Sequence, residues 1–390
     1  MTTNFKPVKM AILGFVNGHV PYWYTLAKRN PHVEVVAVSI DPTVDIYNLT
    51  KRMTRGETKP YNELYDELWD GVEIFHDDEE LLKAHPDVEM AVLGGSNKDH
   101  MKEFRLCAER GIHVVSMKVP TMDMDEYDEM LRLQKEHNII VHTELEMRWK
   151  ANTERLKDVV ASGELGEIDS FTAINFSHFP IWDTWIKIPE EMYGKRIPIK
   201  PGSKLFRGGA LTDHPHIFDL VRYIFESDFD TIYAEIGPNM REDNIVEDFA
   251  YITGRLKNGV IVSLDPSYAN REAPGTACTG VWDWVKSPRI VQVEMQINGS
   301  KGTAYSDGYL SDTVEAMLPN TNYIVISTGN GVPSSTGQSA TLTTLARQIR
   351  LGKDLYKPVV SFEDHKKTIQ TMLAAYESIA TGEVVKVKYD

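Results

Sequence analysis

The stretch that decides the fold is Lys9-Met-Ala-Ile-Leu-Gly14, followed by Val33-Glu-Val-Val-Ala-Val-Ser-Ile40 and then by Asp41. The first run is short and apolar and the second is rich in valine, so each predicts a buried strand. Between them, Pro21 opens a segment with one apolar face, which predicts a helix. A strand, a glycine turn, a helix and a strand that ends in an acid are typical of a dinucleotide-binding βαβ unit.

In such a unit the backbone and the helix N-terminus face a pyrophosphate, and the acid binds a ribose hydroxyl. Gly14 fits the first position of the G-x-G-x-x-G fingerprint, but Val16 and His19 occupy the other two positions, with Gly18 one residue early. Two roles remain open for Asp41: a ribose ligand, or a turn residue at the end of a strand.

The alternation of strands and helices continues to about residue 150. It predicts a parallel, doubly wound sheet whose right-handed crossovers bring the strand ends to one edge. Further strands are expected at 72–75, 88–94, 111–117 and 139–143, and helices at 77–84, 99–110 and 124–136.

The run Gly111-Ile-His-Val-Val-Ser-Met-Lys-Val-Pro120 places Lys118 at the carboxyl end of a buried strand. Ligands bind at that edge in open α/β sheets. Taken alone, Lys118 is either a solvated strand-end charge or a cation that acts on a ligand.

After residue 150 the pattern changes to short runs of alternating apolar and polar residues. They predict a largely antiparallel sheet with one solvated or helix-covered face. A Gly/Ser/Pro-rich run over 330–339 predicts a loop. The predicted architecture is a Rossmann-type domain over 1–146, and an α+β domain with a large open sheet over 147–390. The strands of this sheet are expected at 168–177, 229–237, 247–256, 259–268, 289–297 and 321–327.

The segment 179–208 is rich in proline and carries Trp182 and Trp185. Its length and composition favour either a lid or binding loop, or an arm used in oligomer packing.

Residues 208–225 predict an amphipathic helix, because apolar residues recur at i, i+3, i+4 and i+7. Pro215 is expected in its first turn, with Thr212 or Asp213 as the cap. Asp213 would then neighbour His216, and a carboxylate beside an imidazole is what general acid/base chemistry needs. The alternatives are a cap beside a structural histidine, and a metal site that includes His214.

Composition and charge narrow the class of protein. With 390 residues the chain is long enough for two cores, and its net charge of −15 argues against nucleic acid or an anionic membrane as the main partner. Cys107 and Cys278 form neither a disulfide framework nor a metal-binding spacing, so no metal is expected. Since no run approaches about 18 apolar residues, a cytoplasmic location is expected.

Taken together, these motifs resemble those of the glucose–fructose oxidoreductase, inositol dehydrogenase and rhizopine-catabolism (Gfo/Idh/MocA) family over nearly the whole chain. Met117 and Val119 depart from this pattern, because they stand where the family has the Glu and Pro of a Glu-Lys-Pro motif. The matching residues are Ile12-Leu-Gly14, Asp41, Asn97, His100, Gly111-Ile-His-Val-Val115 before Lys118, Arg148-Trp149, Ser162-Gly-Glu-Leu-Gly-Glu-Ile168, Gly208-Gly-x-Leu-x-Asp-x-x-His-x-x-Asp219 and residues 376–385.

The resemblance implies a dehydrogenase that transfers hydride between nicotinamide and a secondary alcohol of a sugar, glycoside or cyclitol. It implies Lys118, His216 and Asp213 as the catalytic residues. His216 would take the hydroxyl proton with Asp213 beside it, and Lys118 would stabilise the oxygen as negative charge develops.

The cofactor expected is NAD rather than NADP, because the Asp41 carboxylate would repel a 2′-phosphate. The residues expected to bind substrate are Lys118, Arg148, Trp182, Trp185, Asp213 and His216. Those expected to bind the cofactor are Gly14, Phe15, Asn17, Gly18, His19, Asp41, Gly95, Ser96, Asn97, His100 and Lys118.

The expected partners are a small-molecule substrate and further copies of the chain, as a dimer or tetramer formed through the C-terminal sheet. Two other functions fit the same fold: a non-catalytic NAD(P)-binding sensor, and an NAD-assisted glycosidase.

Overall fold

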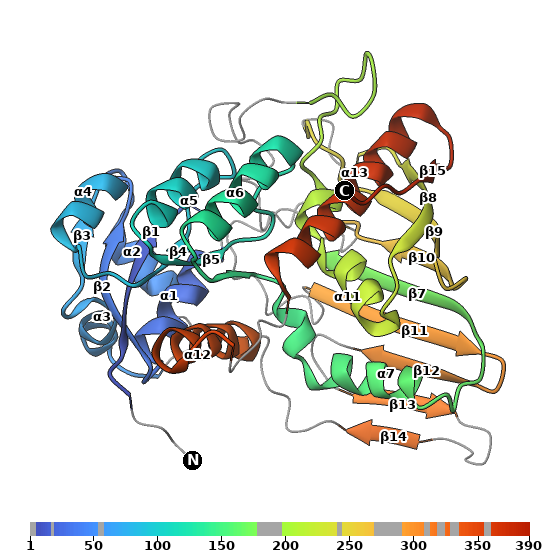
Figure 1. Cartoon of the computed structure of the whole chain (residues 1–390), viewed down its shortest axis with the longest axis horizontal. Helices are drawn as coiled ribbons and strands as arrows, with labels where there is room; N and C mark the ends of the chain where they lie inside the picture. The colour runs from blue at the N-terminus through green and yellow to red at the C-terminus, as the bar shows by residue number, and fades with distance from the viewer. Residues whose placement is uncertain are drawn as a thin grey trace. The chain divides into compact units, whose positions relative to one another are not determined.

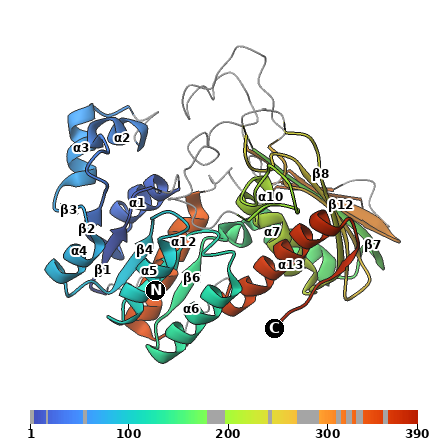
Figure 2. The same cartoon turned by 90° about the horizontal axis from the view of Figure 1, so that it is seen from above.

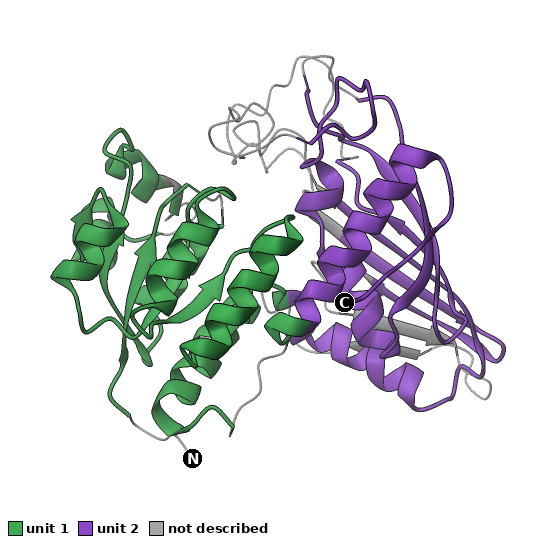
Figure 3. Ribbon diagram, turned by 45° about the horizontal axis from the view of Figure 1, so that its top comes forward, with its two compact units in different colours: residues 1–146, 192–194, 335–363 green, residues 147–191, 195–334, 364–390 purple. Residues whose placement is uncertain are grey.

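The chain divides into two compact units, coloured separately in Figure 3. Unit 1 holds residues 1–146, 192–194 and 335–363, and unit 2 holds residues 147–191, 195–334 and 364–390. The computed structural model describes residues 5–16, 19–53, 58–177, 197–239, 244–268, 291–307, 313–317, 324–327, 335–354 and 360–390.

Unit 1 is built on a six-stranded sheet with the order β3-β2-β1-β4-β5-β6 (Figure 1), in which every neighbouring pair is parallel. The direction of winding reverses between β1 and β4, which is the topology of dinucleotide-binding sheets. The predicted doubly wound sheet is therefore confirmed. Its strands are β1 (Val8–Leu13), β2 (Val33–Ser39), β3 (Glu73–Phe75), β4 (Met90–Leu93), β5 (His113–Ser116) and β6 (Val141–Thr143).

The central strands of this sheet, β1 and β4, are apolar except for Lys9, as expected for strands that helices cover. Every residue of β4 is buried, as are all but one of β1, and this explains why both read as continuous apolar runs. The helices are α1 (Val20–Lys28), α2 (Ile46–Met53), α3 (Tyr61–Trp69), α4 (Asp78–Ala84), α5 (His100–Ala108), α6 (Met124–Glu136) and α12 (Ser335–Leu351).

Helix α12 comes from a distant part of the chain and packs in unit 1. It contacts α1, β1 and β2, and its Leu342, Leu345 and Ala346 lie in the same buried cluster as Met10 and Trp23. The loop expected over 330–339 is wrong for its second half, where α12 begins, because the apolar face of this helix is buried against the sheet. Residues 335–363, assigned from the sequence to the second domain, thus pack with the first unit.

Unit 2 is built on a nine-stranded sheet with the order β14-β13-β12-β11-β7-β10-β9-β8-β15. Every neighbouring pair is antiparallel except β7 and β10, which run parallel, so the predicted open, mostly antiparallel sheet is confirmed. The strands are β7 (Ile168–Ser177), β8 (Phe229–Ile236), β9 (Ala250–Leu256), β10 (Ile261–Asp265), β11 (Val291–Gly299), β12 (Gly302–Asp307), β13 (Thr313–Met317), β14 (Ile324–Ser327) and β15 (Val385–Lys386).

Helices cover one face of this sheet. Figures 1 and 2 show α7 (Ala151–Ala161), α11 (His216–Phe225) and α13 (Phe362–Thr381) on the same side. In the strands, alternate residues point to this side and are buried, as β9 shows with Ala250, Ile252 and Leu256. The helix that carries His216 is thereby fixed against a rigid sheet.

The amphipathic helix expected within 208–225 forms as α11, but its predicted cap, Thr212 or Asp213, is wrong. A short helix, α10 (Ala210–Asp213), ends before Pro215, and α11 begins at His216 with Pro215 at its cap position. The cause is local: the residue before a proline is disfavoured in helical conformation, and His214 has φ −112° and ψ 57°. Asp213 therefore ends one helix, whereas His216 begins the next.

A 3₁₀ turn, η1 (Glu146–Trp149), is the segment within which the chain leaves unit 1. None of the helices in the described part of the chain is both long and apolar enough to span a bilayer.

Candidate active site

The ends of β1 and β4 come into direct backbone contact in unit 1. Gly14 follows β1 with φ +69°, and a Cβ there would lie 2.6 Å from both the Cα and the N atom of Gly95. The Val16 amide donates to the Gly94 carbonyl over 3.0 Å. A Cβ at Gly94 would in turn lie 2.5 Å from the Gly14 carbonyl oxygen, so glycine is required at Gly14 and Gly94 by the approach of the two loops at the point where the winding reverses.

Side chains from β2, α4 and α5 support this backbone contact between the two loops. The Gly14 amide donates to Ser39 Oγ over 2.7 Å, and Ser39 Oγ donates in turn to Asp78. Glu103 of α5 lies against Gly95, where an added Cβ would be 2.0 Å from Glu103 Oε1. Burial, followed by the negative charges of Asp78 and Asp99, raises the pKa of Glu103, so its carboxyl retains a proton more readily.

Several residues expected to bind the cofactor are engaged in local contacts. Phe15 is buried with its ring edge-on to Tyr24. Ser96 Oγ donates to Asp99, and His100 Nδ1 lies 3.0 Å from the carbonyl oxygen of Pro120. These contacts shape the loops after β4 and β5. Asn97 is half-buried in the first of these loops, and Asn17 and Gly18 lie outside the described residues.

Asp41 follows β2 and is exposed. Its Oδ1 accepts from the Thr43 amide over 2.8 Å and from the Thr43 hydroxyl over 2.5 Å. These two hydrogen bonds hold the pKa of Asp41 below its ordinary value. The carboxylate therefore closes a turn, while Oδ2 accepts no hydrogen bond from the residues that the structure describes.

Lys118 lies two residues beyond β5 and is buried, with 7% of its surface exposed; its peptide bond to Val119 is cis. Buried Glu144 lies on the next strand end, since its amide donates to the Ser116 carbonyl over 3.0 Å. The Lys118 charge acts to lower the pKa of both Glu144 and Glu146, which places the ammonium within electrostatic reach of these two carboxyls.

Glu144 also receives two donors from the first helix of unit 1. Its Oε1 lies 2.8 Å from His19 Nδ1 and 2.7 Å from Trp23 Nε1. Burial opposes ionisation of this pair, but mutual attraction outweighs it: the pKa of His19 is raised and that of Glu144 is lowered. An imidazolium is thereby favoured at the position of the third fingerprint glycine.

Glu146 is the second carboxyl in this cluster, which consists of His19, Lys118, Glu144 and Glu146. Its main chain packs tightly on α12, because a Cβ at Gly337 would lie 2.5 Å from Glu146 Cβ. Burial, and then the charge of Glu144, raise the pKa of Glu146 to about 7. Sequence reasoning missed both glutamates, although their position directly after a strand ending at the Lys118 edge was a usable signal.

In unit 2, around the break between α10 and α11, His214 and His216 are buried and Asp213 is half-buried. The Tyr268 hydroxyl donates to Asp213 Oδ2 over 3.0 Å, and His214 Nε2 lies 3.8 Å from the same oxygen. The His214 ring is edge-on to Tyr268 and its Nδ1 contacts the Pro266 carbonyl. Tyr268, which sequence reasoning missed, thus joins the predicted Asp213 site.

A second group of side chains fixes the segment that leads into Asp213. Glu247 Oε1 accepts from the Tyr376 hydroxyl over 2.6 Å and from the Leu211 amide over 3.2 Å. The Tyr376 oxygen also lies 2.8 Å from Thr212 Oγ1 and accepts from the Gly208 amide. Burial raises the pKa of Glu247 to about 7.

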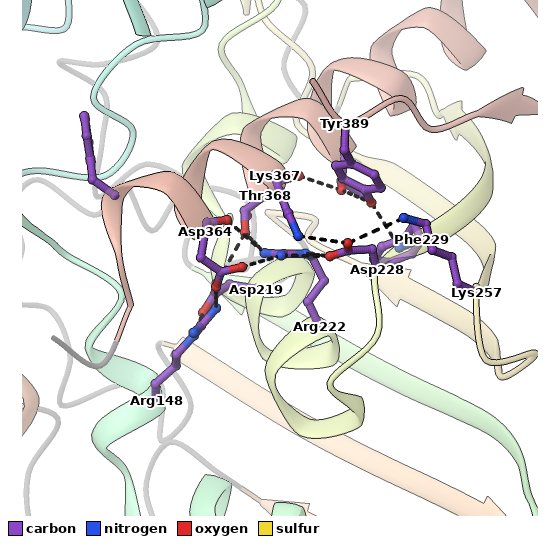
Figure 4. Close-up of polar contacts among 12 residues, drawn as sticks. Arg148, Asp219, Arg222, Asp228, Phe229, Lys257, Asp364, Lys367, Thr368 and Tyr389 are labelled. Atoms are coloured by element: carbon purple, nitrogen blue, oxygen red, sulfur yellow. Dashed lines mark hydrogen bonds and ion pairs between the residues drawn. The ribbon is translucent and has the colours of Figure 1, made fainter. Parts of the chain in front are cut away.

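Arg148, expected to bind substrate, is buried in an ion-pair network of unit 2 (Figure 4). Its Nε donates to Asp219 Oδ2 over 2.7 Å and its Nη2 to Asp219 Oδ1 over 2.6 Å. A third bond joins Nη2 to Asp364 Oδ2 over 2.8 Å.

The structure therefore gathers the predicted residues into two groups, with Lys118 in unit 1 and Asp213 and His216 in unit 2. Trp182 and Trp185 lie outside the described residues. Within the described ranges, no three His, Cys, Asp or Glu side chains are grouped so that they could hold a metal ion.

Comparison with known proteins supports the resemblance noted in the sequence. Residues 153–305 match the family model described as the GFO/IDH/MocA C-terminal domain. Myo-inositol 2-dehydrogenase of Thermotoga maritima is 22% identical over 330 residues, which are 82% of this chain and 85% of that protein.

Solved structures share the fold over nearly the whole length. An oxidoreductase from Agrobacterium radiobacter, in complex with NAD⁺, L-tartaric acid and magnesium, aligns with a TM-score of 0.70 at 19% identity, covering 98% of each chain. An inositol dehydrogenase homologue from Azotobacter vinelandii, complexed with NADH and myo-inositol, aligns with a TM-score of 0.71 at 14% identity, also covering 98% of each chain. At these identities the likeness establishes the fold.

Proposed function

Because the C-terminal domain of this chain belongs to the GFO/IDH/MocA family of oxidoreductases, we propose that the protein is an NAD-dependent dehydrogenase. It transfers hydride between nicotinamide and a secondary hydroxyl, or the corresponding ketone, of a sugar, glycoside or cyclitol. The named activity of the Thermotoga maritima relative and the ligands of the Azotobacter vinelandii structure support this substrate class.

The observation that carries the proposal is the close approach of Gly14 and Gly95 at the β1/β4 reversal point. The absence of side chains there leaves bare backbone at the edge where open α/β sheets bind nucleotides. A Cβ at Gly14 would collide with the backbone of Gly95, and one at Gly95 would collide with Glu103, so the glycines present fit the close approach of a dinucleotide. Bound NAD supplies the hydride acceptor.

Lys118 is assigned to stabilise the substrate oxygen. A buried ammonium at the carboxyl edge of the sheet places fixed positive charge in a low-dielectric environment, where it acts strongly on a developing alkoxide. Met117, the neighbour of Lys118 in the chain, carries no charge. The negative charges near the Lys118 ammonium come from Glu144 and Glu146. They balance the Lys118 charge from the neighbouring strand end.

His216 is assigned as the acid/base that takes the hydroxyl proton as hydride leaves the carbon. Asp213 lies before it in the chain, with one carboxylate oxygen held by Tyr268. The break at Pro215 separates the two residues into different helices, so their mutual orientation depends on the contacts of each helix with unit 2.

We also propose that copies of the chain associate through the nine-stranded sheet, on the face opposite its helices. On that face Tyr251 of β9 and Ile261 of β10 are 46% and 49% exposed. Light scattering on the native protein would test this, since Tyr251→Lys together with Ile261→Lys should yield monomers.

The experiment that tests the activity measures NAD reduction with a panel of sugars, glycosides and cyclitols, and NADH oxidation with keto-sugars. Lys118→Ala and His216→Ala should abolish turnover while calorimetry still detects NAD binding. Lys135→Ala, an exposed lysine on α6, serves as the control and should match wild type. NAD binding without turnover on any substrate would indicate a non-catalytic NAD-binding protein instead.

A further inference from the structure

The chain passes between its units at two described points, after Glu146 and after Glu363. Arg148 lies two residues beyond the first of these crossings, and Asp364 is the first residue beyond the second. Their side chains meet, with Arg148 Nη2 donating to Asp364 Oδ2 over 2.8 Å. One ion pair thus joins the two described segments through which the chain enters unit 2.

The same guanidinium is bound to α11, the helix that begins with His216. Besides its two bonds to Asp219, Arg148 stacks over the Tyr223 ring at 4.7 Å. His216, Asp219 and Tyr223 follow one another at i, i+3 and i+7, so they lie on one side of the helix. Arg148 therefore holds the helical face that carries the proposed acid/base.

The geometry of the Arg148–Asp219 pair suits a role in positioning α11 better than a role in stabilising the fold. Burying Arg148 and Asp219 removes two opposite charges from water, whereas Asp364 is only half-buried. Replacing such a buried pair by apolar packing is often neutral or favourable for stability. A bidentate arginine–carboxylate pair, in contrast, fixes both distance and orientation. The network therefore provides geometry that apolar contacts do not.

We propose that Arg148 is a positioning residue that sets the orientation of His216 through Asp219, with Asp364 holding Arg148 in place. This inference rests on the proposed function, because His216 matters only if it transfers a proton. In this role Arg148 acts through α11, whereas the sequence had predicted that it binds the substrate.

The far end of α11 offers a matched control. Arg222 donates to Asp228 from Nε over 3.0 Å and from Nη2 over 2.9 Å, and Lys367 donates to the same aspartate over 3.1 Å (Figure 4). Asp228, like Asp219, is thus held by an arginine, and Arg222 also donates to Asp364 Oδ1 over 2.6 Å. Asp228 nevertheless lies beyond the C-terminus of α11 and twelve residues from His216.

The test compares Asp219→Asn with Asp228→Asn in the full chain. Each removes one carboxylate charge at nearly constant volume. Asp219→Asn should lower kcat by roughly tenfold to a hundredfold and leave the KM for NAD unchanged, as expected for a small misplacement of a reacting group. Asp228→Asn should keep kcat within about twofold of wild type, since its contacts are remote from the reacting group.

A second readout does not depend on turnover. In protein labelled at histidine, the imidazole signals of His216, assigned with His216→Gln, should shift in Asp219→Asn and stay fixed in Asp228→Asn. If Asp219→Asn does not fold, Arg148→Lys, which keeps the charge but loses the bidentate pair, replaces it in both measurements.

The outcomes separate the two proposals. A shifted His216 signal in a protein that has no NAD-linked turnover would refute the dehydrogenase but retain the positioning role. Equal kcat values and unmoved His216 signals in both variants would overturn the positioning role, whatever the activity of wild type.

Discussion

The Tyr268 hydroxyl donates a hydrogen bond to Asp213 Oδ2 over 3.0 Å. Tyr268 is buried and Asp213 is half-buried, and they come from segments 55 residues apart, one after β10 and the other at the end of α10. The bond occupies one oxygen of the carboxylate, which limits its rotation beside the proposed acid/base.

We expect Tyr268→Phe to lower kcat by about tenfold, because Asp213 loses a donor that fixes its orientation. The free energy of unfolding should fall by only about 1 kcal/mol, the usual cost of one hydrogen bond. Steady-state kinetics and denaturant unfolding measure the two effects. Tyr251→Phe is the control, since its hydroxyl accepts from Ser263 over 2.8 Å on the exposed face of the sheet. Equal kcat values in the two variants would remove Tyr268 from the site.

Glu247→Gln should change how stability depends on pH. The folded-state pKa of Glu247 is raised from its ordinary 4.5 to about 7, so its contribution to stability is full below pH 4.5 and is lost as the pH rises through 7. Relative to wild type, the free energy of unfolding of the variant should therefore rise as the pH increases from 4.5 through 7. The difference should reach at most roughly 3 kcal/mol at pH 8. Urea unfolding across this range gives the curve.

The exposed Glu377→Gln on α13 provides the comparison and should run parallel to wild type. If Glu247→Gln also ran parallel to wild type, burial of that carboxyl would not raise its pKa in the folded protein.

Gly14→Ala and Gly111→Ala separate two costs of removing a glycine. Both residues have a positive φ, +69° and +68°, but only at Gly14 would a Cβ collide with another loop. Gly111→Ala should therefore cost about 1 kcal/mol for the left-handed conformation alone. Gly14→Ala should cost more and should weaken NAD binding by at least about tenfold, since the pyrophosphate approaches this backbone. Unchanged NAD affinity, measured by calorimetry, would place the pyrophosphate elsewhere.

Asp41→Ala should improve NADP binding, because it removes a carboxylate that would repel a 2′-phosphate. An increase of about tenfold in NADP affinity is expected from the loss of one repulsive charge near the site. Asp45→Ala removes the same charge four residues later and should not alter the preference. If the two variants behaved alike, the role of Asp41 would be limited to the turn that it forms with Thr43.

Much of the fold could be predicted because its signals are local. Buried parallel strands such as β4 are continuous apolar runs, and the helix expected over 124–136 forms as α6 with those bounds, where Asp123 caps its first turn. The cap of α11 was misplaced although its cause, Pro215, is equally local, because the apolar periodicity lies within α11 and does not mark where the helix begins.

The contacts that shape the candidate site could not be predicted, because they join residues far apart in the chain. His19 pairs with Glu144 across 125 residues and Arg148 with Asp364 across 216. No periodicity or spacing encodes such partners. Only the glutamates after β6 had a local signal, since acids at the carboxyl edge of a parallel sheet lie where ligands bind.

The packing of α12 on the first sheet has a consequence for genetic dissection of the protein. A gene fragment that stops at codon 146 would encode every strand of the parallel sheet but would lack Leu342, Leu345 and Ala346, which bury Met10 and Trp23. Its product would expose that apolar surface and be prone to aggregation. Chimaeras that exchange cofactor domains between relatives must therefore transplant residues 335–363 together with the first 146, as two separate inserts.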